Sequence, residues 1–256
     1  MLTIKEKLLV LVKSSPIVSK SYEHVVCVAG ITENGEWRRI YPIPWEVFWS
    51  TKKTKFKKKF WIEYELKSNK PSNYRPESRK IIYQTIKPLH EENFTHIKKL
   101  LDERLMTLCE LQRRSSKEIS LGVIKPVIKD FREDEDRHYD EMREKARQLD
   151  FSGKSAVKID IPKKQFSYIF DCGLKECKGH NIMCEDWEVG ELYRRCENYR
   201  KRGKYPDRKT VFEKVKRKMF DWMLEKRELY FVVGTHNIWG TYLILSLVYP
   251  KKTDVF

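Results

Sequence analysis

The stretch HVVCVAGITENGEWRRIY, residues 24–41, sets the fold class expected for this chain. Its first half is an apolar, β-branched run that is typical of a strand, and residues 36–41 form a second candidate strand. Asn34 and Gly35 between them predict a tight type I′ turn, because both central residues of that turn need positive φ angles. The stretch therefore predicts a β-hairpin.

More strand patterns follow this hairpin. Pro42 and Pro44 stop regular pairing, and residues 60–67 (FWIEYELK) then alternate with the period of a half-buried strand. Residues 81–86 form another short candidate strand. Several short strands with intervening turns predict a small curled barrel, which we assign to residues 1–90.

The middle of the chain has a different period. Apolar residues from Phe94 to Leu111 recur at helical spacing, residues 119–131 return to strand-like composition, and residues 132–148 are highly charged. We read the charged run as an exposed helix or a loop, with a solvated face as its plainest role. Residues 91–150 are therefore expected to be a helical and charged region that connects two modules.

Residues 151–256 return to β-rich composition. Residues 155–161 and 166–170 are candidate strands, and the segment HNIWG, residues 236–240, lies between two strand-like runs in the manner of a hairpin turn. Helical patterns run from Trp187 to about Tyr199 and from Thr210 to about Lys226. The expected fold class is α+β, with two small β-barrel modules joined by helices and a Cys/His insertion in the second module.

The charge of the chain is its strongest compositional signal. It has 53 Lys and Arg against 37 Asp and Glu, which gives a net charge of +16 and a pI near 9.4. A heat-adapted surface would also be highly charged but balanced, whereas this surplus favours a polyanionic partner such as nucleic acid. No apolar run is long enough to span a membrane and the N-terminus lacks a signal-peptide pattern, so we expect a cytoplasmic protein.

Four potential metal ligands lie in the stretch CGLKECKGHNIMC, residues 172–184. Zinc prefers four such soft or borderline ligands in a tetrahedron, and Gly173 and Gly179 permit the tight backbone that a short loop needs. Cys196 is a possible substitute ligand. An iron–sulfur cluster also fits, and the bland alternative is that these cysteines are small buried apolar residues. The predicted ligands are Cys172, Cys177, His180 and Cys184.

Four ligands from one loop would close the coordination sphere, so the expected metal is structural rather than catalytic. Glu185, Asp186 and Glu188 follow the cluster, and one of them could serve as a base. Their plainer role is in the first turn of the following helix, where the helix dipole favours carboxylates.

An aromatic and basic segment predicts a surface for unpaired bases. If residues 36–41 form a strand, Trp37, Arg39 and Tyr41 share one face, and Arg38 lies on the other with Ile40. Aromatic rings beside guanidinium groups can stack on bases while the cations contact phosphates. The alternative for the aromatic residues is core packing beneath a loop.

Basic side chains elsewhere extend this predicted surface. The run KKTKFKKK, residues 52–59, can neutralise several phosphates, although it could equally be a solvated linker. Basic segments at residues 194–209 and 214–218 would give the second module a similar surface, unless they are only the exposed sides of amphipathic helices. The additional predicted phosphate contacts are Lys52, Lys53, Lys55, Lys57, Lys58, Lys59 and Arg75.

Three segments together resemble a little-characterised prokaryotic family described as a dual OB-containing domain. They are residues 26–44 (VCVAGITENGEWRRIYPIP), the loop SNYRPES at residues 72–78, and the cysteine-rich stretch with the final hairpin. The resemblance runs from about His24 to Pro250 and implies two oligonucleotide-binding-type barrels, nucleic-acid binding and a role in defence against mobile elements. It implies no assigned reaction.

The residues therefore predict a nucleic-acid-binding protein with a structural metal, zinc before iron–sulfur. Two alternatives stay open. One is an accessory subunit that completes the nucleic-acid channel of a larger defence effector, with a protein partner. The other is a metal-dependent nuclease or iron–sulfur protein, although no Walker-type loop, nucleotide-binding glycine pattern or nucleophile elbow is present.

Overall fold

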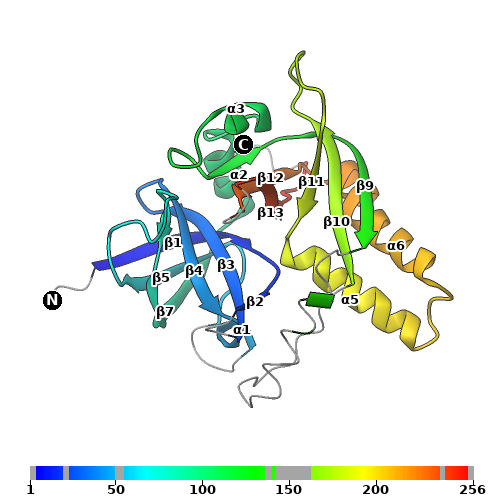
Figure 1. Cartoon of the computed structure of the whole chain (residues 1–256), viewed down its shortest axis with the longest axis horizontal. Coiled ribbons are helices and arrows are strands. Elements are labelled where there is room, and N and C mark those ends of the chain that lie inside the picture. Colours follow the sequence, from blue (N-terminus) through cyan, green and yellow to red (C-terminus); the bar gives the residue numbers. More distant parts are fainter. Residues whose placement is uncertain are drawn as a thin grey trace.

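The structure is a computed structural model that describes residues 4–19, 23–49, 55–135, 140–141, 144, 163–236 and 240–252. Two sheets lie side by side, one built mainly from the first ninety residues and the other from the remainder (Figure 1). Helices flank the second sheet, so the expected α+β class is confirmed. The predicted strand at residues 155–161 lies outside the described residues, as does most of the charged run.

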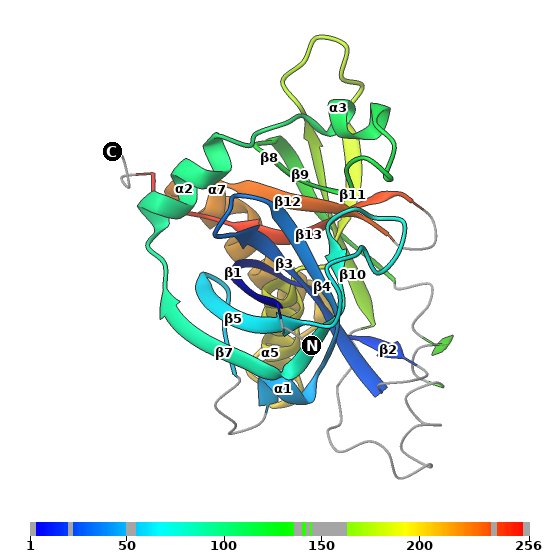
Figure 2. The same ribbon diagram turned by 90° about the vertical axis from the view of Figure 1, so that its left-hand side faces the viewer.

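The first sheet curls strongly (Figure 2). Its central strand, β1, pairs antiparallel with β3 and β5. On the outer sides, β3 pairs with β4 and β5 pairs with β7. The short β6 pairs in parallel with β4 and is followed almost at once by β7, which brings the two ends of the sheet toward each other. The strands are β1 (Ile4–Lys13), β2 (Ile17–Ser19), β3 (Glu23–Thr32), β4 (Trp37–Pro44), β5 (Phe60–Leu66), β6 (Ser78–Arg79) and β7 (Ile81–Glu91).

Both faces of β1 are buried, which explains its continuous apolar run. Leu8 and Val10 point into the core enclosed by the first sheet, whereas Leu9 and Leu11 point into a second core that the two sheets share. The neighbouring β3 approaches so closely that a Cβ at Gly30 would lie 1.8 Å from the Leu9 carbonyl oxygen. Glycine is therefore required at that position.

The hairpin expected around Asn34 and Gly35 exists, but its turn differs from the predicted type. Residues 33–36 form a four-residue loop in which Gly35 has a φ of 79° and Asn34 has none of the positive φ that type I′ needs. The Thr32 and Glu36 backbones hydrogen-bond across the loop with an N···O distance of 2.9 Å. The loop is therefore longer than the turn that the dipeptide predicted.

The second sheet is also curled. Strands β8 and β9 occupy its opposite edges although only Lys125 and Pro126 separate them, so the two edges meet at this link. Neighbouring strands are antiparallel except β11 and β13, which are parallel. The strands are β8 (Leu121–Ile124), β9 (Val127–Glu135), β10 (Lys164–Asp171), β11 (His180–Cys184), β12 (Tyr230–Thr235) and β13 (Tyr242–Val248).

This arrangement moves the division between the modules. Because β8 and β9 pair with strands after residue 163, the second sheet begins well before the boundary expected near Phe151. The region 91–150 is thus no separate connector. Its strand-like part belongs to the second module, hereafter the residues from about 104 onward, and the first module is the part before it.

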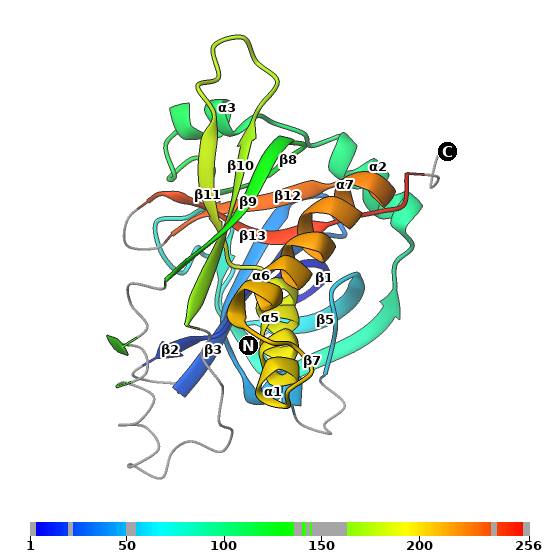
Figure 3. The ribbon, with the colours of Figure 1, turned by 90° about the vertical axis from the view of Figure 1, so that its right-hand side faces the viewer.

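Helices cover the second sheet on one side. The helices α5 and α6 lie against each other and against the sheet (Figure 3). The expected single helix at residues 94–111 is wrong, because the chain leaves the helix after Asp102 and Thr107 begins a new one with a capping box to Glu110. The helices are α1 (Glu46–Trp49), α2 (Phe94–Asp102), α3 (Leu108–Arg113), α5 (Trp187–Lys201), α6 (Arg208–Lys216), η1 (Arg217–Trp222) and α7 (Met223–Lys226).

A shared core joins the two modules. Apolar residues of β1 and β3 pack there against Leu121, Val232 and Leu245 of the second sheet, and α2 closes one end with Ile97 and Leu101. Each module also has a core of its own. Burial of this common surface away from water holds the modules as one body.

Candidate metal centre and placement of the basic residues

Four potential ligands converge where α3 meets the hairpin of β10 and β11. Cys172 follows β10, Cys177 lies in the connecting turn, His180 begins β11, and Cys109 comes from α3. Their ligand atoms all lie within 4.8 Å of one another. Gly173 and Gly179 have φ angles of 72° and 83°, as expected for glycines that tighten this turn.

The spacing of the ligand atoms fits a single tetrahedral ion. His180 Nε2 lies 3.2 Å from Cys172 Sγ, 3.3 Å from Cys177 Sγ and 3.4 Å from Cys109 Sγ. Metal–sulfur bonds of about 2.3 Å and metal–nitrogen bonds of about 2.0 Å place neighbouring ligand atoms roughly 3.5 Å apart. The cluster Cys109–Cys172–Cys177–His180 could therefore hold a metal ion.

The predicted fourth ligand, Cys184, is wrong. It lies at the end of β11, and four residues of extended strand separate it from His180 by about 13 Å. Its side chain is buried in the core of the second module, where burial raises the pKa of its thiol. Cys196, the suggested substitute, is buried in the same core.

The cluster has the character of a structural centre. Three thiols and one imidazole fill a tetrahedron and leave no position for a reacting water. The ligands tie α3 to a hairpin that begins more than fifty residues later in the chain. No local spacing marks Cys109 as a ligand, since it lies far from the other three in sequence and within a helical apolar pattern.

The predicted arginines are buried. Arg38 is 5% exposed and its Nη2 lies 2.7 Å from Glu6 and 2.8 Å from Glu36. Arg39 is 2% exposed and donates to the Ser120 carbonyl at 3.1 Å, beside Glu77 at 3.4 Å. These guanidinium groups are held within the fold, which corrects the expectation that they form an open phosphate-binding face.

Arg75 is buried too, at 4% exposure. Its loop packs on the second module, where Nη1 donates to the Thr235 carbonyl at 3.2 Å. Trp37 packs against the shared core, and Tyr41 is half-buried, which raises the pKa of its hydroxyl. The predicted stacking surface of the first module is thus largely a boundary with the second.

The structure describes four lysines of the run at residues 52–59, and their environments differ. Lys52 and Lys53 lie outside the described residues, whereas Lys55 and Lys57 are exposed. Lys59 forms an ion pair with Glu91 and lies 4.5 Å from the centroid of the Phe94 ring. Lys55, Lys57 and Lys59 are solvated or weakly paired, in contrast to Lys58.

Lys58 reaches across to the second module, which corrects its assignment as a phosphate contact. Its Nζ lies 2.9 Å from Asp186 Oδ2 and 3.2 Å from Glu188. Asp186, which is 1% exposed, also accepts hydrogen bonds from Ser246 Oγ and the Leu247 amide. Burial alone would lower the pKa of Lys58, but the two carboxylates raise it.

The network also bears on Asp186 as a candidate base. Besides these contacts, its Oδ1 accepts the Glu188 amide at 2.6 Å as the N-cap of α5. Both carboxylate oxygens are occupied within the fold. The helix-terminal role expected for this acidic segment is therefore the one that its geometry supports.

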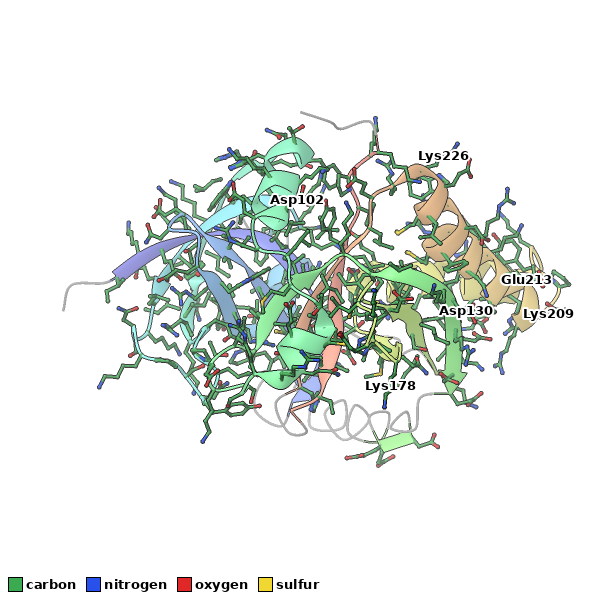
Figure 4. All side chains as sticks on the ribbon, turned by 90° about the horizontal axis from the view of Figure 1, so that it is seen from above. Asp102, Asp130, Lys178, Lys209, Glu213 and Lys226 are labelled. Atoms are coloured by element: carbon green, nitrogen blue, oxygen red, sulfur yellow. The ribbon has the colours of Figure 1, made fainter. Side chains whose placement is uncertain are left out.

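The exposed positive charge gathers on the second module instead, over α5 to α7. This surface carries only four exposed carboxylates, those of Asp207, Glu213, Asp221 and Glu225. Figure 4 shows Lys209 and Lys226 on the outer side of these helices, with Glu213 between them. We define the basic helical surface by its exposed cations: Arg195, Lys201, Arg202, Lys204, Arg208, Lys209, Lys214, Arg217, Lys218 and Lys226.

Aromatic rings are interleaved with these cations. Two cations lie over the Trp222 ring: Lys218 Nζ is 3.1 Å from its centroid and Arg227 Cζ is 4.8 Å from it. Lys204 lies 5.1 Å from the Tyr199 ring. Sequence patterns had marked these segments as basic, and the structure places them on one exposed surface.

The fold and site define an α+β protein of two curled sheets with a candidate metal centre. A family model described as Domain of unknown function (DUF8757) matches residues 104–256, more than half of the chain, so the chain belongs to this family. A second model, described as Domain of unknown function (DUF8758), matches residues 4–105. Neither the curated proteins nor the solved structures include a match. Among the described helices, none is both long and apolar enough to cross a membrane.

Proposed function

We propose that this protein binds nucleic acid, with the basic helical surface as its main phosphate contact. The observation that carries this proposal is the gathering of ten exposed cations against four exposed carboxylates on α5 to α7. A polyanion gains from such a surface because each neutralised phosphate releases bound counterions. The partly exposed rings of Tyr199 and Trp222 add surfaces on which bases can stack.

The strand order supports an OB-type assignment for both modules. An OB-fold is a five-stranded, partly open barrel with Greek-key connections that commonly binds oligonucleotides. In the first module, β1 pairs with β3 and β5, and the parallel contact of β4 with β6 draws the barrel closed. In the second, β8 and β9 act as one interrupted strand, because β8 pairs with β12 and β9 pairs with β10. Strands β11 and β13 of that module pair in parallel.

We further propose that the metal is zinc in a structural role. Three thiolates and one imidazole are a ligand set that zinc favours, and the compact spacing suits one ion better than a cluster with each thiolate on a different iron. When bound, the ion would supply charge neutralisation and a fixed link between α3 and the β10–β11 hairpin.

Binding can be tested by fluorescence anisotropy with labelled single- and double-stranded DNA and RNA at several salt concentrations. We expect affinity that falls steeply with salt. Replacing Lys201, Arg202 and Lys204 with Gln should reduce the slope of log affinity against log salt by about 2 to 3, given roughly 0.7–0.9 per lost phosphate contact. No binding of any strand at low salt would overturn the proposal.

A matched control removes the same charge elsewhere. Lys67, Lys70 and Lys80 are exposed on the first module, and their replacement with Gln should leave the slope unchanged. Denaturing gels of the same mixtures, with magnesium or manganese added, test the nuclease alternative. Cut strands would favour that alternative over simple binding.

A further inference from the structure

A cavity of about 260 Å³ lies between the modules, on the side where several loops meet. The first module contributes Cys27, Arg39, Tyr41 and Arg75, and the second contributes Thr235 and Glu185. Of these residues, Arg39 and Tyr41 share one face of β4, as the alternation of that strand predicted, although the face is turned inward. Apolar residues, among them Leu243 and Leu245, supply most of the remaining lining, so the cavity combines a largely apolar wall with a few polar groups from segments far apart in sequence.

Two buried guanidinium groups, those of Arg39 and Arg75, line this cavity. Arg39 has Glu77 as its carboxylate partner, at 3.4 Å. For Arg75, the described residues provide no carboxylate within ion-pairing distance; its side chain donates to the Asn73 amide oxygen and the Thr235 carbonyl, and lies 5.8 Å from the centroid of the Tyr74 ring. Burial lowers the pKa of Arg75, and the nearby charge of Arg39 lowers it further. A buried cation without a counter-ion is costly.

Unused hydrogen-bonding capacity points into the same place. Arg75 donates through Nε and Nη1, and among the described residues Nη2 has no acceptor. Thr235 is 2% exposed and its buried Oγ1 has no hydrogen-bond partner in the described part of the chain. Buried polar groups are normally satisfied, so Thr235 Oγ1 indicates a ligand that would complete it, and Arg75 Nη2 can supply a further donor. Tyr41 adds a hydroxyl to the lining.

We propose that this cavity binds a phosphate monoester, with Arg75 and Thr235 as direct contacts and Arg39 as the supporting charge. A planar guanidinium suits the oxygens of a phosphate dianion, and two nearby guanidinium groups favour a dianion over a single carboxylate. The Glu185 carboxylate, which also lines the cavity, would disfavour an anion in its immediate neighbourhood, so the phosphate belongs at the Arg75 side.

The position of the cavity suggests the source of that phosphate. Residues Ser14 and Ile17 after β1, the loop that carries Arg75, and the turn after β12 all reach it. In OB-type barrels these connections are the ones that contact oligonucleotides. We therefore expect the phosphate at the end of a nucleic-acid strand, an assignment that rests on the proposed function, whereas a free nucleotide would not depend on it.

The test compares oligonucleotides of one sequence that end in a 5′-phosphate, a 3′-phosphate or hydroxyls only, together with adenosine monophosphate and inorganic phosphate. Affinities are measured by anisotropy competition and calorimetry. A phosphorylated end should bind at least about tenfold more tightly than the hydroxyl end, equivalent to roughly 1.4 kcal/mol. Arg75→Met and Thr235→Val should each remove most of that preference.

Two controls keep the outcomes distinct. The Lys201, Arg202 and Lys204 replacement should weaken all strands alike and leave the preference for phosphorylated ends intact. Thr235→Val conserves the shape of the side chain, so it serves if Arg75→Met fails to fold. Equal affinity for all ends, with no binding of either small phosphate, would overturn this inference and leave the proposed function standing. Binding of adenosine monophosphate or phosphate without strand binding would support a phosphate site in this cavity and overturn the proposed function.

Discussion

Basic side chains that the sequence marks in the two modules lie in opposite environments. In the first, Arg38, Arg39 and Arg75 are almost completely buried, and Lys58 is enclosed by carboxylates of the other module. In the second, the basic helical surface faces solvent. The comparison teaches that a basic segment in a sequence does not measure surface charge, because the partners that neutralise it come from distant strands.

The difference follows from the elements that carry the charges. Arg38 and Arg39 lie on β4, a largely buried strand, so each is paired with a carboxylate from a distant segment, Glu6 or Glu77. A helix that packs by one stripe leaves its remaining faces in water. The four experiments below test this contrast from the largest expected effect to the smallest.

Loss of the proposed metal should affect the second module most. Cys109→Ser should abolish metal binding and lower the melting temperature by at least about 10 °C, because structural zinc contributes several kcal/mol to folding. Elemental analysis and thermal unfolding measure both effects. Cys184→Ser is the control and should keep one metal per chain; the opposite pattern would mean that the ligand set is wrong.

Replacement of the buried Lys58 should have the second-largest effect on stability. Lys58→Met leaves Asp186 buried without its cation and should reduce the free energy of unfolding by about 3–5 kcal/mol in a urea titration. The neighbouring exposed Lys57→Met should change it by less than about 0.5 kcal/mol. Similar values for the two variants would contradict the contrast between buried and exposed lysines.

Lys13 offers a pH-dependent test at the module boundary. Its Nζ lies 4.2 Å from the Phe48 ring centroid and 5.4 Å from that of Trp187, and burial is the main cause that lowers its pKa from 10.5 to about 8. Glu191 and Glu188 partly oppose this shift, while Lys55 and Lys58 add to it.

Between pH 8 and pH 10.5, the Lys13 amine is protonated in the unfolded state but largely neutral in the folded state, so the unfolded state binds more protons. The contribution of Lys13 to stability should therefore rise as pH increases from 8 to 10.5, by roughly 3 kcal/mol in all. Lys13→Met should lack this rise, whereas the exposed Lys5→Met should keep it. Nuclear magnetic resonance of the lysine Cε carbons gives the pKa directly, and a value near 10.5 would refute the effect.

A single exposed cation should have the smallest effect. Lys201→Gln should lower the salt slope of nucleic-acid binding by about 0.7–0.9 and leave the free energy of unfolding unchanged within about 0.5 kcal/mol. Anisotropy and urea unfolding measure the two quantities. A stability loss as large as that of Lys58→Met would show that the basic helical surface is not solvated as the fold indicates.

Local patterns predicted local structure well. The hairpin of β3 and β4, the helix α5 and the run from α6 to α7 all follow from periodicity and turn residues close together in sequence. Three of the four candidate ligands share one short loop, so their spacing was also informative. Strand β1 received no assignment, because a strand buried on both faces shows no alternation.

The features that were missed depend on contacts between distant residues. Arg38 meets Glu6 across a separation of 32 residues, and Lys58 meets Asp186 across 128. Cys109 joins its cluster only when α3 packs beside the β10–β11 hairpin. No local spacing encodes these meetings, whereas Cys184 had suitable spacing but the wrong local conformation, since an extended strand carries it away from His180.

The double burial of β1 has a consequence during synthesis. The outer face of that strand, with Leu9 and Leu11, is covered completely only after β13, which ends at Val248, has left the ribosome. At about 5–20 residues per second, a first barrel that is complete at Glu91 waits roughly 8–30 s for this cover. The nascent chain therefore presents an apolar strand for that interval, which makes it a natural client for chaperones that act at the ribosome.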